Sequence, residues 1–316
     1  MHIMNIIKKR IKYAKKEIND LLSVINRRSW PKVEPANNAV SIVIVNYNTA
    51  DLLAGLIFSL FRILGKDQFL KIVIVDNGST DESVGLILAL REKGLVDAIL
   101  NSKQKYHGLG LNQGMNYLRN LAMKQETACR YVLILDSDVV VLHRNTISDA
   151  VRFAESTNAS LVGQFQYEGW PEGYAHVSAL LLDPTKVWRR GVHPFDDSGT
   201  PAAKMHYSLR KKESGIKNFP FRDANYVLHI GRGTITKIHN SNSTKNRHYR
   251  SDPARVAPHF HGNPHGQEIY NTFEDLFRLH VHSILPKDLL DACMQPSLLK
   301  LDSPYLQITL PKNNHD

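Results

Sequence analysis

Cysteine is scarce in this chain, with only Cys129 and Cys293 among 316 residues. Neither has a second cysteine at a metal-binding spacing, which argues against a disulfide-stapled fold and a cysteine-based zinc site and fits a reducing cytosol. Long hydrophobic runs are missing too, because no stretch reaches the roughly 18 apolar residues that a membrane-spanning helix needs. The N-terminus also lacks the apolar core of a secretory signal peptide. These absences predict a cytoplasmic protein.

Acidic side chains are outnumbered by basic ones, 30 to 40, which gives a formal net charge of +10. Such a surplus could favour anionic lipid, phosphorylated substrates or nucleic acid. Because no zinc-finger or ribonucleoprotein motif accompanies the charge, we do not expect nucleic acid as a partner. With 42% hydrophobic and 22% charged residues, the composition suits one large α/β domain or two smaller ones.

The first 39 residues differ in pattern from the rest. Residues 3–28 place apolar side chains at a helical spacing and carry a basic opposite face, and Pro31 ends the predicted helix. Three interpretations stay open: the helix packs on its own domain, pairs with another subunit, or lies on the inner face of an anionic membrane. Residues 31–39 then form a linker.

Strand-like and helix-like segments alternate from residue 40 onward. Apolar runs rich in Val, Ile and Leu predict strands at residues 40–45, 71–75, 96–100 and 131–135, and we expect those at 71–75 and 131–135 to be buried. The segments between these strands have helical periodicity. We expect Thr49 to cap the first helix, and Ser79 with Glu82 to form a capping box for the second. The alternation predicts an α/β fold with a mostly parallel central sheet and helices on both faces.

Polar residues follow the carboxyl ends of the predicted strands, where ligands of parallel sheets bind. The sharpest case is Asp136-Ser137-Asp138, which interrupts two apolar runs. Carboxylates beside a core need a partner or a metal, and Mg²⁺ or Mn²⁺ commonly bridges such oxygens to phosphates. The alternative is an ordinary turn, because Asp and Ser are common turn residues.

A glycine-rich segment from Gly108 to Gly114 enters the helix before Asp136. A dinucleotide-binding loop is excluded, because the glycines are spaced GxGxxxG and follow the third strand rather than the first. Sugar-nucleotide synthesis on a related fold is disfavoured for a similar reason, since no glycine-rich loop follows the first strand.

Four segments together resemble the family 2 glycosyltransferases of GT-A fold. They are residues 40–49, residues 72–81, Asn101 with residues 108–116, and Asp136-Ser137-Asp138. The resemblance covers residues 40–145 best and implies a Rossmann-like GT-A domain. Its nucleotide-sugar-binding half would be residues 40–145 and its acceptor-binding half residues 146–239, preceded by the N-terminal helix and linker and followed by a flexible loop and helical extension at 240–316.

The resemblance also implies roles for single residues. Asp138 matches the metal ligand, Asp76 the carboxylate that accepts a hydrogen bond from the base, and Asp136 a position near the ribose or sugar that could also bind the metal. The implied cofactors are Mn²⁺ or Mg²⁺ and a nucleoside-diphospho-sugar, with a UDP-sugar expected first. The remaining positions expected to bind the donor are Asn48, Asn101, Gly108, Asn112 and Arg232.

A strand that ends in His229 leads into two glycines that flank Arg232. Several GT-A enzymes supply a late histidine as a further metal ligand, and His229 fits that place. Arg232 would supply a counter-charge for the diphosphate. The alternative is that His229 is an ordinary core residue with satisfied hydrogen bonds.

The general base is the weakest match to the family. Inverting members carry a Glu-Asp or Asp-Asp base, but this sequence has Ala203-Lys204 at the expected spacing. Asp197, and after it Asp196, are the remaining carboxylates that could take the acceptor's proton. The alternative is a loop in which both aspartates hydrogen-bond their own backbone.

These observations predict a metal-dependent, inverting glycosyltransferase of class EC 2.4. It would act on a saccharide, lipid-linked or protein acceptor in surface polysaccharide or glycan synthesis. The alternative is a non-catalytic glycosyltransferase-like module that docks on a membrane or a partner, which the missing Glu-Asp would favour. The C-terminal segment could serve membrane contact or a homo-oligomer.

Overall fold

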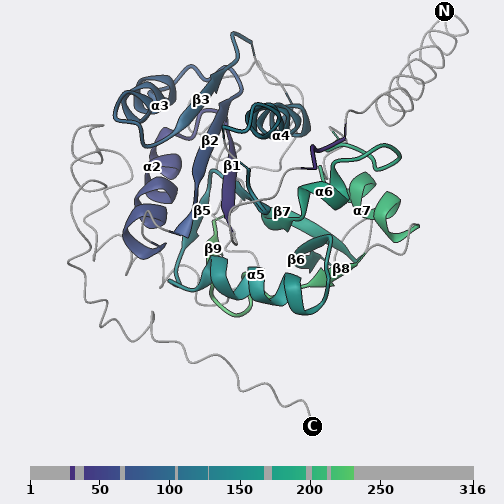
Figure 1. Ribbon diagram of the computed structural model, residues 1–316. Coiled ribbons are helices and arrows are strands. Elements are labelled where there is room, and N and C mark those ends of the chain that lie inside the picture. Colours follow the sequence, from purple (N-terminus) through teal and green to yellow (C-terminus); the bar gives the residue numbers. More distant parts are fainter. Residues whose placement is uncertain are drawn as a thin grey trace, which may run out of the picture.

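A seven-stranded sheet forms the centre of the computed structural model, in the order β3-β2-β1-β4-β7-β6-β8 (Figure 1). The structure describes residues 29–32, 39–64, 68–103, 106–126, 128–166, 173–196, 201–211 and 215–230. The predicted N-terminal helix and the segment at 240–316 lie outside these residues. Among the described residues, no helix is both long and apolar enough to cross a membrane.

The strands of the main sheet are mostly parallel, as the sequence predicts. β1 lies between β2 and β4 and is parallel to both, and β3 extends the parallel set. β7 runs antiparallel to both β4 and β6, and β8 is parallel to β6. The strands are β1 Val40–Asn46, β2 Lys71–Asp76, β3 Asp97–Leu100, β4 Tyr131–Asp136, β6 Leu161–Gln166, β7 Tyr174–Leu182 and β8 Ile216–Asn218.

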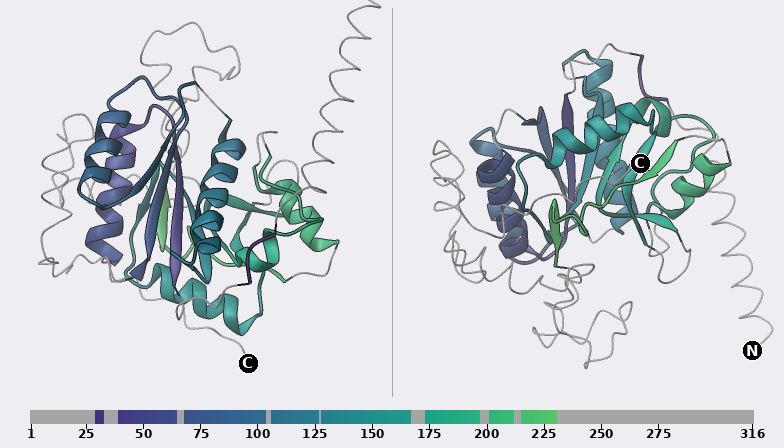
Figure 2. Two further views of the ribbon diagram at one scale, coloured as in Figure 1. Left: turned by 45° about the horizontal axis from the view of Figure 1, so that its top comes forward. Right: turned by 90° about the horizontal axis from the view of Figure 1, so that it is seen from below.

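Helices cover both faces of this sheet, which Figure 2 shows for α2 and α3 on one side and α4 on the other. The central strands are therefore apolar on both faces. In β1, Ile42 and Ile44 face the core beneath α2, α3 and α5. Val43 and Val45 face the core beneath α4, α6 and α7. The helices are α2 Ala50–Ser59, continued by a π-helical turn at Leu60–Leu64, α3 Ser83–Glu92, α4 His107–Met123, α5 Thr146–Ser156, α6 Pro184–Val187 and α7 Ala203–Arg210.

The glycine-rich segment packs a helix closely on the sheet. The expectation of a glycine-rich turn before the helix is wrong, because Gly108 and Gly110 already lie within α4. A Cβ atom on Gly110 would come within 2.9 Å of Val45 Cγ1, and one on Gly114 would come closer still to Val43. The glycines therefore let α4 approach β1.

Two predicted helix caps differ from the structure. Thr49 does precede α2, but its hydroxyl donates to Asn46 Oδ1 at 2.7 Å and forms no capping bond. The predicted capping box is wrong, because α3 begins at Ser83 and the Ser79 hydroxyl donates to Asp76 Oδ1 at 2.6 Å. For Ser79, the buried carboxylate of Asp76 is a stronger acceptor than the partners that the local pattern offers.

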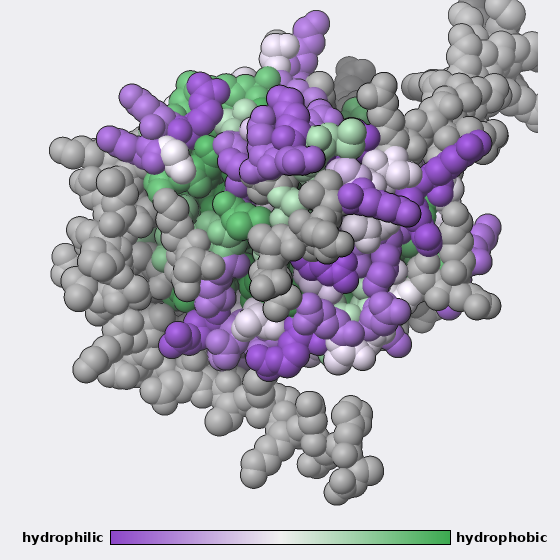
Figure 3. Space-filling model, in the orientation of Figure 1, coloured by the Kyte–Doolittle hydropathy of each residue, from purple (hydrophilic) through white to green (hydrophobic). Residues whose placement is uncertain are grey.

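A second, two-stranded sheet joins β5 (Val139–Val141) to β9 (Val227–His229) in antiparallel register. β5 directly follows the aspartates at the end of β4, so this small sheet brings a late part of the chain to that point. The surface over α2 and α3 is the most apolar part of the face in Figure 3, and Leu88 of α3 is an exposed apolar residue.

Candidate functional site

Asp136, Asp138 and His229 come together at the carboxyl end of β4. One ligand atom from each lies within 4.8 Å of the other two. His229 Nε2 is 3.3 Å from Asp138 Oδ1 and 3.6 Å from Asp136 Oδ2, and the side chains are only 7%, 11% and 15% exposed. Two carboxylates and an imidazole are ligands that Mn²⁺ accepts, and Mg²⁺ is commonly held by such carboxylates. The structure thus brings together the three residues predicted as metal ligands.

The pairing of β5 with β9 accounts for the position of His229. Val139 lies opposite His229 in the register, and Ile230 N donates to Asp138 O at 3.0 Å. The last residue of β9 is therefore held beside the second aspartate, although the two are far apart in the sequence. A lone histidine in a buried strand thereby becomes a neighbour of two carboxylates.

The cluster lies at the point where the connections of the sheet diverge. From β1 the chain continues to β2 on one side of β1, whereas β4 lies on the other side of β1. Open α/β sheets bind ligands where the strand order reverses in this way. The hydroxyls of Thr49 and Ser137 are 2.9 Å apart across this boundary. The loop after β1 is thus joined to the loop that carries the aspartates.

The electrostatics of the cluster favour bound protons when no cation is present. Burial raises the pKa of Asp136, against the effect of His107 and His229, and Asp138 raises it further. Burial alone would lower the pKa of His229, but the carboxylates of Asp138 and Asp136 outweigh burial and hold it above its ordinary value. Both shifts favour the protonated forms of these groups, so a cation would compete with protons for them.

Three residues near the cluster were not singled out from the sequence. His107, the first residue of α4, places Nε2 3.4 Å from Asp136 Oδ1. The His176 ring lies 5.3 Å from the His229 ring, centroid to centroid. Arg222 is buried and acts electrostatically on both Asp136 and His229. The position of His107 just before the glycine run was the one sequence signal available for any of the three.

Asp76 lies at the carboxyl end of β2, as predicted, but its carboxylate is fully occupied. Oδ1 accepts from Asn46 Nδ2 at 2.9 Å and from Ser79 Oγ at 2.6 Å, and Oδ2 accepts from the backbone N of Gly78 at 3.0 Å and of Ser79 at 2.9 Å. A carboxylate has about four acceptor positions, so the chain itself uses all of them. In this conformation Asp76 stabilises its loop, and contact with a base remains a prediction.

The asparagines predicted to bind the donor fix segments to one another. Asn48, at a φ of 53°, accepts from Thr80 N at 2.7 Å and so ties the loop after β1 to the loop after β2. Asn101 exchanges two hydrogen bonds, of 2.9 and 3.0 Å, with Gln113. Asn112 bonds both backbone groups of Phe195, at 2.9 and 3.1 Å. These residues shape the edge of the sheet around the cluster.

The segment with the candidate base is held by that last pair of bonds. Asp196, next to Phe195, is buried and forms an ion pair with Lys204 of α7. Lys204 stands where the family pattern has a carboxylate, so this chain carries the opposite charge there and neutralises Asp196. Asp197 and Arg232 lie outside the described residues.

Comparison with known proteins gives a family match. Residues 41–212 match the model of glycosyl transferase family 2. The poly(ribitol-phosphate) beta-N-acetylglucosaminyltransferase TarP of Staphylococcus aureus strain N315 is 28% identical over 132 residues, which are 41% of this chain and 37% of TarP. The match thus spans little more than a third of that relative. His229 lies beyond the residues that the family model matches.

Solved structures with a similar arrangement are more distant in sequence. Residues 1–349 of TarS from S. aureus are 14% identical, with a TM-score of 0.43 over 57% of this chain and 58% of the other. The mannosyltransferase PcManGT from Pyrobaculum calidifontis, in complex with GDP-Man and Mn²⁺, is 15% identical, with a TM-score of 0.45 over 89% of this chain and 86% of the other.

Proposed function

The chain belongs to glycosyl transferase family 2, and from that membership we propose that it transfers a sugar from a nucleoside-diphospho-sugar to a saccharide, lipid-linked or protein acceptor with inversion. The observation that carries the proposal is the cluster of Asp136, Asp138 and His229 at the diverging point of the sheet. The expected donor is a UDP-sugar, and N-acetylglucosamine is the first sugar to test because the name of TarP specifies its transfer.

Asp138, His229 and Asp136 would hold a divalent cation, Mn²⁺ or Mg²⁺. The site fits such an ion, because its three ligand atoms converge within 4.8 Å and two of them are hard carboxylate oxygens. A bound cation would offset the negative charge that develops on the diphosphate leaving group. His107 contacts Asp136 Oδ1 and would orient that carboxylate toward the site.

A carboxylate of the segment after Phe195 would take the proton of the acceptor hydroxyl during in-line attack. Asp197 is the first candidate and Asp196 the second, and the ion pair with Lys204 leaves Asp196 less free to accept a proton. Asn112 would position either residue, because it fixes Phe195 on α4. Transfer rates of Asp197→Asn and Asp196→Asn, with donor binding measured in parallel, decide between the two.

The test is release of nucleoside diphosphate from a panel of UDP- and GDP-sugars, with Mn²⁺, Mg²⁺ or EDTA. We expect turnover that needs the cation and that falls by about 100-fold or more in Asp138→Asn. Asp97→Asn is the matched control, because Asp97 is the first residue of the edge strand β3 and pairs with Lys71 at 2.8 Å. Full cation-dependent turnover by Asp138→Asn would contradict the role of that residue.

The release assay, together with a measurement of melting temperature, distinguishes an enzyme from a non-catalytic module. A donor that raises the melting temperature in the presence of Mn²⁺, without turnover on any acceptor pool, would favour a binding module. The expected surface polysaccharide or glycan product, the cytoplasmic location with contact at the inner face of the membrane, and self-association all remain predictions. So do the boundaries of the two halves at 40–145 and 146–239, although β7 pairs with β4 and joins the halves in one sheet.

A further inference from the structure

A chain of buried hydrogen bonds runs from the carboxyl end of β2 to the loop that carries the candidate metal ligands. Asn46 Nδ2 donates to Asp76 Oδ1 at 2.9 Å, and Thr49 Oγ1 donates to Asn46 Oδ1 at 2.7 Å. Thr49 Oγ1 also lies 2.9 Å from Ser137 Oγ. Asn46, Thr49 and Asp76 are at most 1% exposed, and Ser137 is 8% exposed. Side chains thus join the carboxyl ends of β1, β2 and β4.

The carboxylate of Asp76 fixes the direction of every bond in this chain. An ionised carboxylate only accepts, so the Asn46 amide turns its nitrogen to Asp76 and its oxygen to Thr49. The amide oxygen also only accepts, so the Thr49 hydroxyl uses its single proton on Asn46. Thr49 can therefore only accept from Ser137, whose hydroxyl is the donor of the 2.9 Å contact. The orientation of the Ser137 side chain is determined in this way.

Thr49 makes these bonds in place of the one that its position favours. It directly precedes α2, where a threonine commonly accepts from a backbone N–H of the first helical turn, but it forms no such bond. The backbone N of Ala50, the first residue of α2, donates instead to Asp81 Oδ2 at 3.1 Å. Departures from a local rule are expected at functional sites, where a side chain is needed for another contact.

Ser137 is the middle residue of the loop, between Asp136 and Asp138. The two carboxylates repel each other, and one oxygen of each lies within 3.6 Å of His229 Nε2. The bond from Ser137 to Thr49 limits the movements by which that repulsion could separate them. Outer contacts of this kind commonly orient the ligands of metal sites, and their removal typically weakens metal binding or activity by about 10- to 100-fold.

We propose that Thr49 is a positioning residue that holds Ser137, and through it the two aspartates of the loop, in the geometry needed for sugar transfer. The bonds of Thr49 to Asn46 and of Asn46 to Asp76 supply the fixed end of the chain. The inference rests on the cation site of the proposed function. It adds a role for Thr49 that needs no contact with substrate, and it gives Asp76 an effect on the aspartates that needs no contact with a base.

The first measurement is Mn²⁺ binding to the full chain, followed by the electron paramagnetic resonance signal of free Mn²⁺. Thr49→Val keeps the shape of the side chain but can form neither bond, and it should weaken Mn²⁺ binding by about tenfold. Thr49→Ser keeps the hydroxyl and should bind Mn²⁺ within about twofold of the wild type. Ser137→Ala should match Thr49→Val. The double variant should bind little worse than either alone, because both changes remove one shared contact.

The second measurement is kcat at saturating Mn²⁺, with the UDP- or GDP-sugar that the wild type turns over. In Thr49→Val, kcat should fall by about tenfold or more while the KM for that donor stays within about threefold, because the change misplaces the loop and removes no donor contact. A purely structural role of Thr49 would lower the melting temperature and leave the Mn²⁺ affinity and kcat of the folded protein unchanged.

Thr157→Val is the matched control, because Thr157 likewise loses a hydroxyl bond, to Phe153 O at 2.6 Å, at the end of α5. It should change neither Mn²⁺ affinity nor kcat. If folded Thr49→Val keeps both at the wild-type value, or if its effect and that of Ser137→Ala add in full, the positioning role is wrong while the cation site stands. Ser137→Ala makes the same test where Thr49→Val does not fold. If the wild type binds no Mn²⁺, the cation site fails, and this inference fails with it.

Discussion

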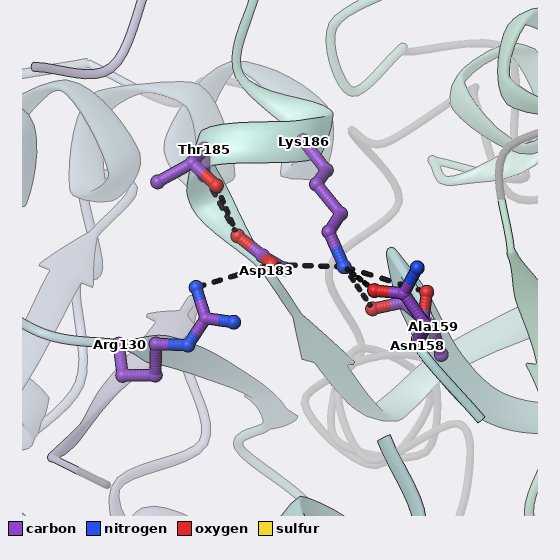
Figure 4. Close-up of polar contacts among 6 residues, drawn as sticks. All are labelled: Arg130, Asn158, Ala159, Asp183, Thr185 and Lys186. Carbon is purple, nitrogen blue, oxygen red and sulfur yellow. Dashed lines mark hydrogen bonds and ion pairs between the residues drawn. The ribbon is translucent and has the colours of Figure 1, made fainter. Parts of the chain in front are cut away.

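β4 has a cluster of buried charge at each of its two ends, and the two clusters are built differently. At its amino end, Asp183 is joined by Arg130 at 3.4 Å and Lys186 at 3.3 Å, and its other oxygen accepts from the backbone N and hydroxyl of Thr185 at 3.1 and 2.6 Å (Figure 4). At its carboxyl end, Asp136 and Asp138 lie beside each other, and the ion-pair partners of Asp136 are His107 and His229.

The difference shows which buried charge serves the fold and which is available for a ligand. A buried carboxylate with opposite charges and hydrogen bonds around it is stable where it lies, whereas two adjacent carboxylates that share one histidine also repel each other. Asp76, with four hydrogen bonds, belongs to the first kind. A buried carboxylate with a raised pKa, such as Asp136, is typical of functional sites.

The largest effect is expected at the compensated end. Asp183→Ala removes both ion pairs and the capping bond at α6. Arg130 and Lys186 are 34% and 30% exposed, so solvent partly screens their ion pairs. We therefore expect a loss of about 3 kcal/mol in the free energy of unfolding. Asp183→Asn can keep the cap and should lose about 2 kcal/mol. Urea unfolding measures both, and Mn²⁺ affinity should not change. If Asp183→Ala were as stable as the wild type, Asp183 would not stabilise the fold, and the contrast between the two ends of β4 would be wrong.

A third way to bury a titratable group sharpens the contrast, because His206 is kept neutral. Burial, assisted by Arg210, lowers the pKa of His206 to about 4, and its Nδ1 accepts from Ala175 N at 3.2 Å. Below pH about 6.5 the unfolded chain takes up the proton more readily than the folded one, so stability should fall as the pH drops from about 6.5 to about 4, by about 2 kcal/mol from this group.

The measurement is urea unfolding at several pH values in the wild type and in His206→Gln. The variant should be less stable near neutral pH, because it packs less well, but should lose less stability on acidification. Equal losses in both proteins over this interval would show that His206 is not held neutral by the fold.

The sequence was sufficient for the elements of the sheet but not for their polar contacts. The predicted strands at 40–45, 71–75, 96–100 and 131–135 match β1 to β4 to within one residue at each end. Three of them match because strands buried on both faces are apolar throughout, whereas β3 is only partly buried. The capping box at Ser79 failed because its hydroxyl has a better partner in Asp76, which β2 brings to it. A local pattern does not contain such a competitor.

The candidate site shows the same limit. Asp136 and Asp138 were found because carboxylates at the end of a buried strand are unusual, and His229 was found through the family resemblance. His107 and Arg222 were missed. The place of His107 beside Asp136 depends on how α4 packs on β1, and the burial of Arg222 depends on how the turn before β9 is fixed by Gln164. Neither contact has a sequence period or a spacing that could predict it.

The smallest expected effect on stability tests the carboxyl end of β4, where Asp136 and Asp138 lie, and its sign matters more than its size. Asp138→Asn removes one of two adjacent carboxylates but keeps an oxygen that can accept from His229 Nε2, now 3.3 Å away. Relief of the like-charge repulsion should therefore stabilise the cation-free protein by about 1 kcal/mol at pH 8 in EDTA.

The control Asp97→Asn loses a partly exposed ion pair and should be destabilised by less than about 1 kcal/mol. Urea unfolding with EDTA and with Mn²⁺ separates the outcomes: Mn²⁺ should stabilise the wild type and not Asp138→Asn. If Asp138→Asn were instead less stable than the wild type in EDTA, the pairing of Asp138 with His229 would outweigh its repulsion by Asp136, and the two ends of β4 would be alike.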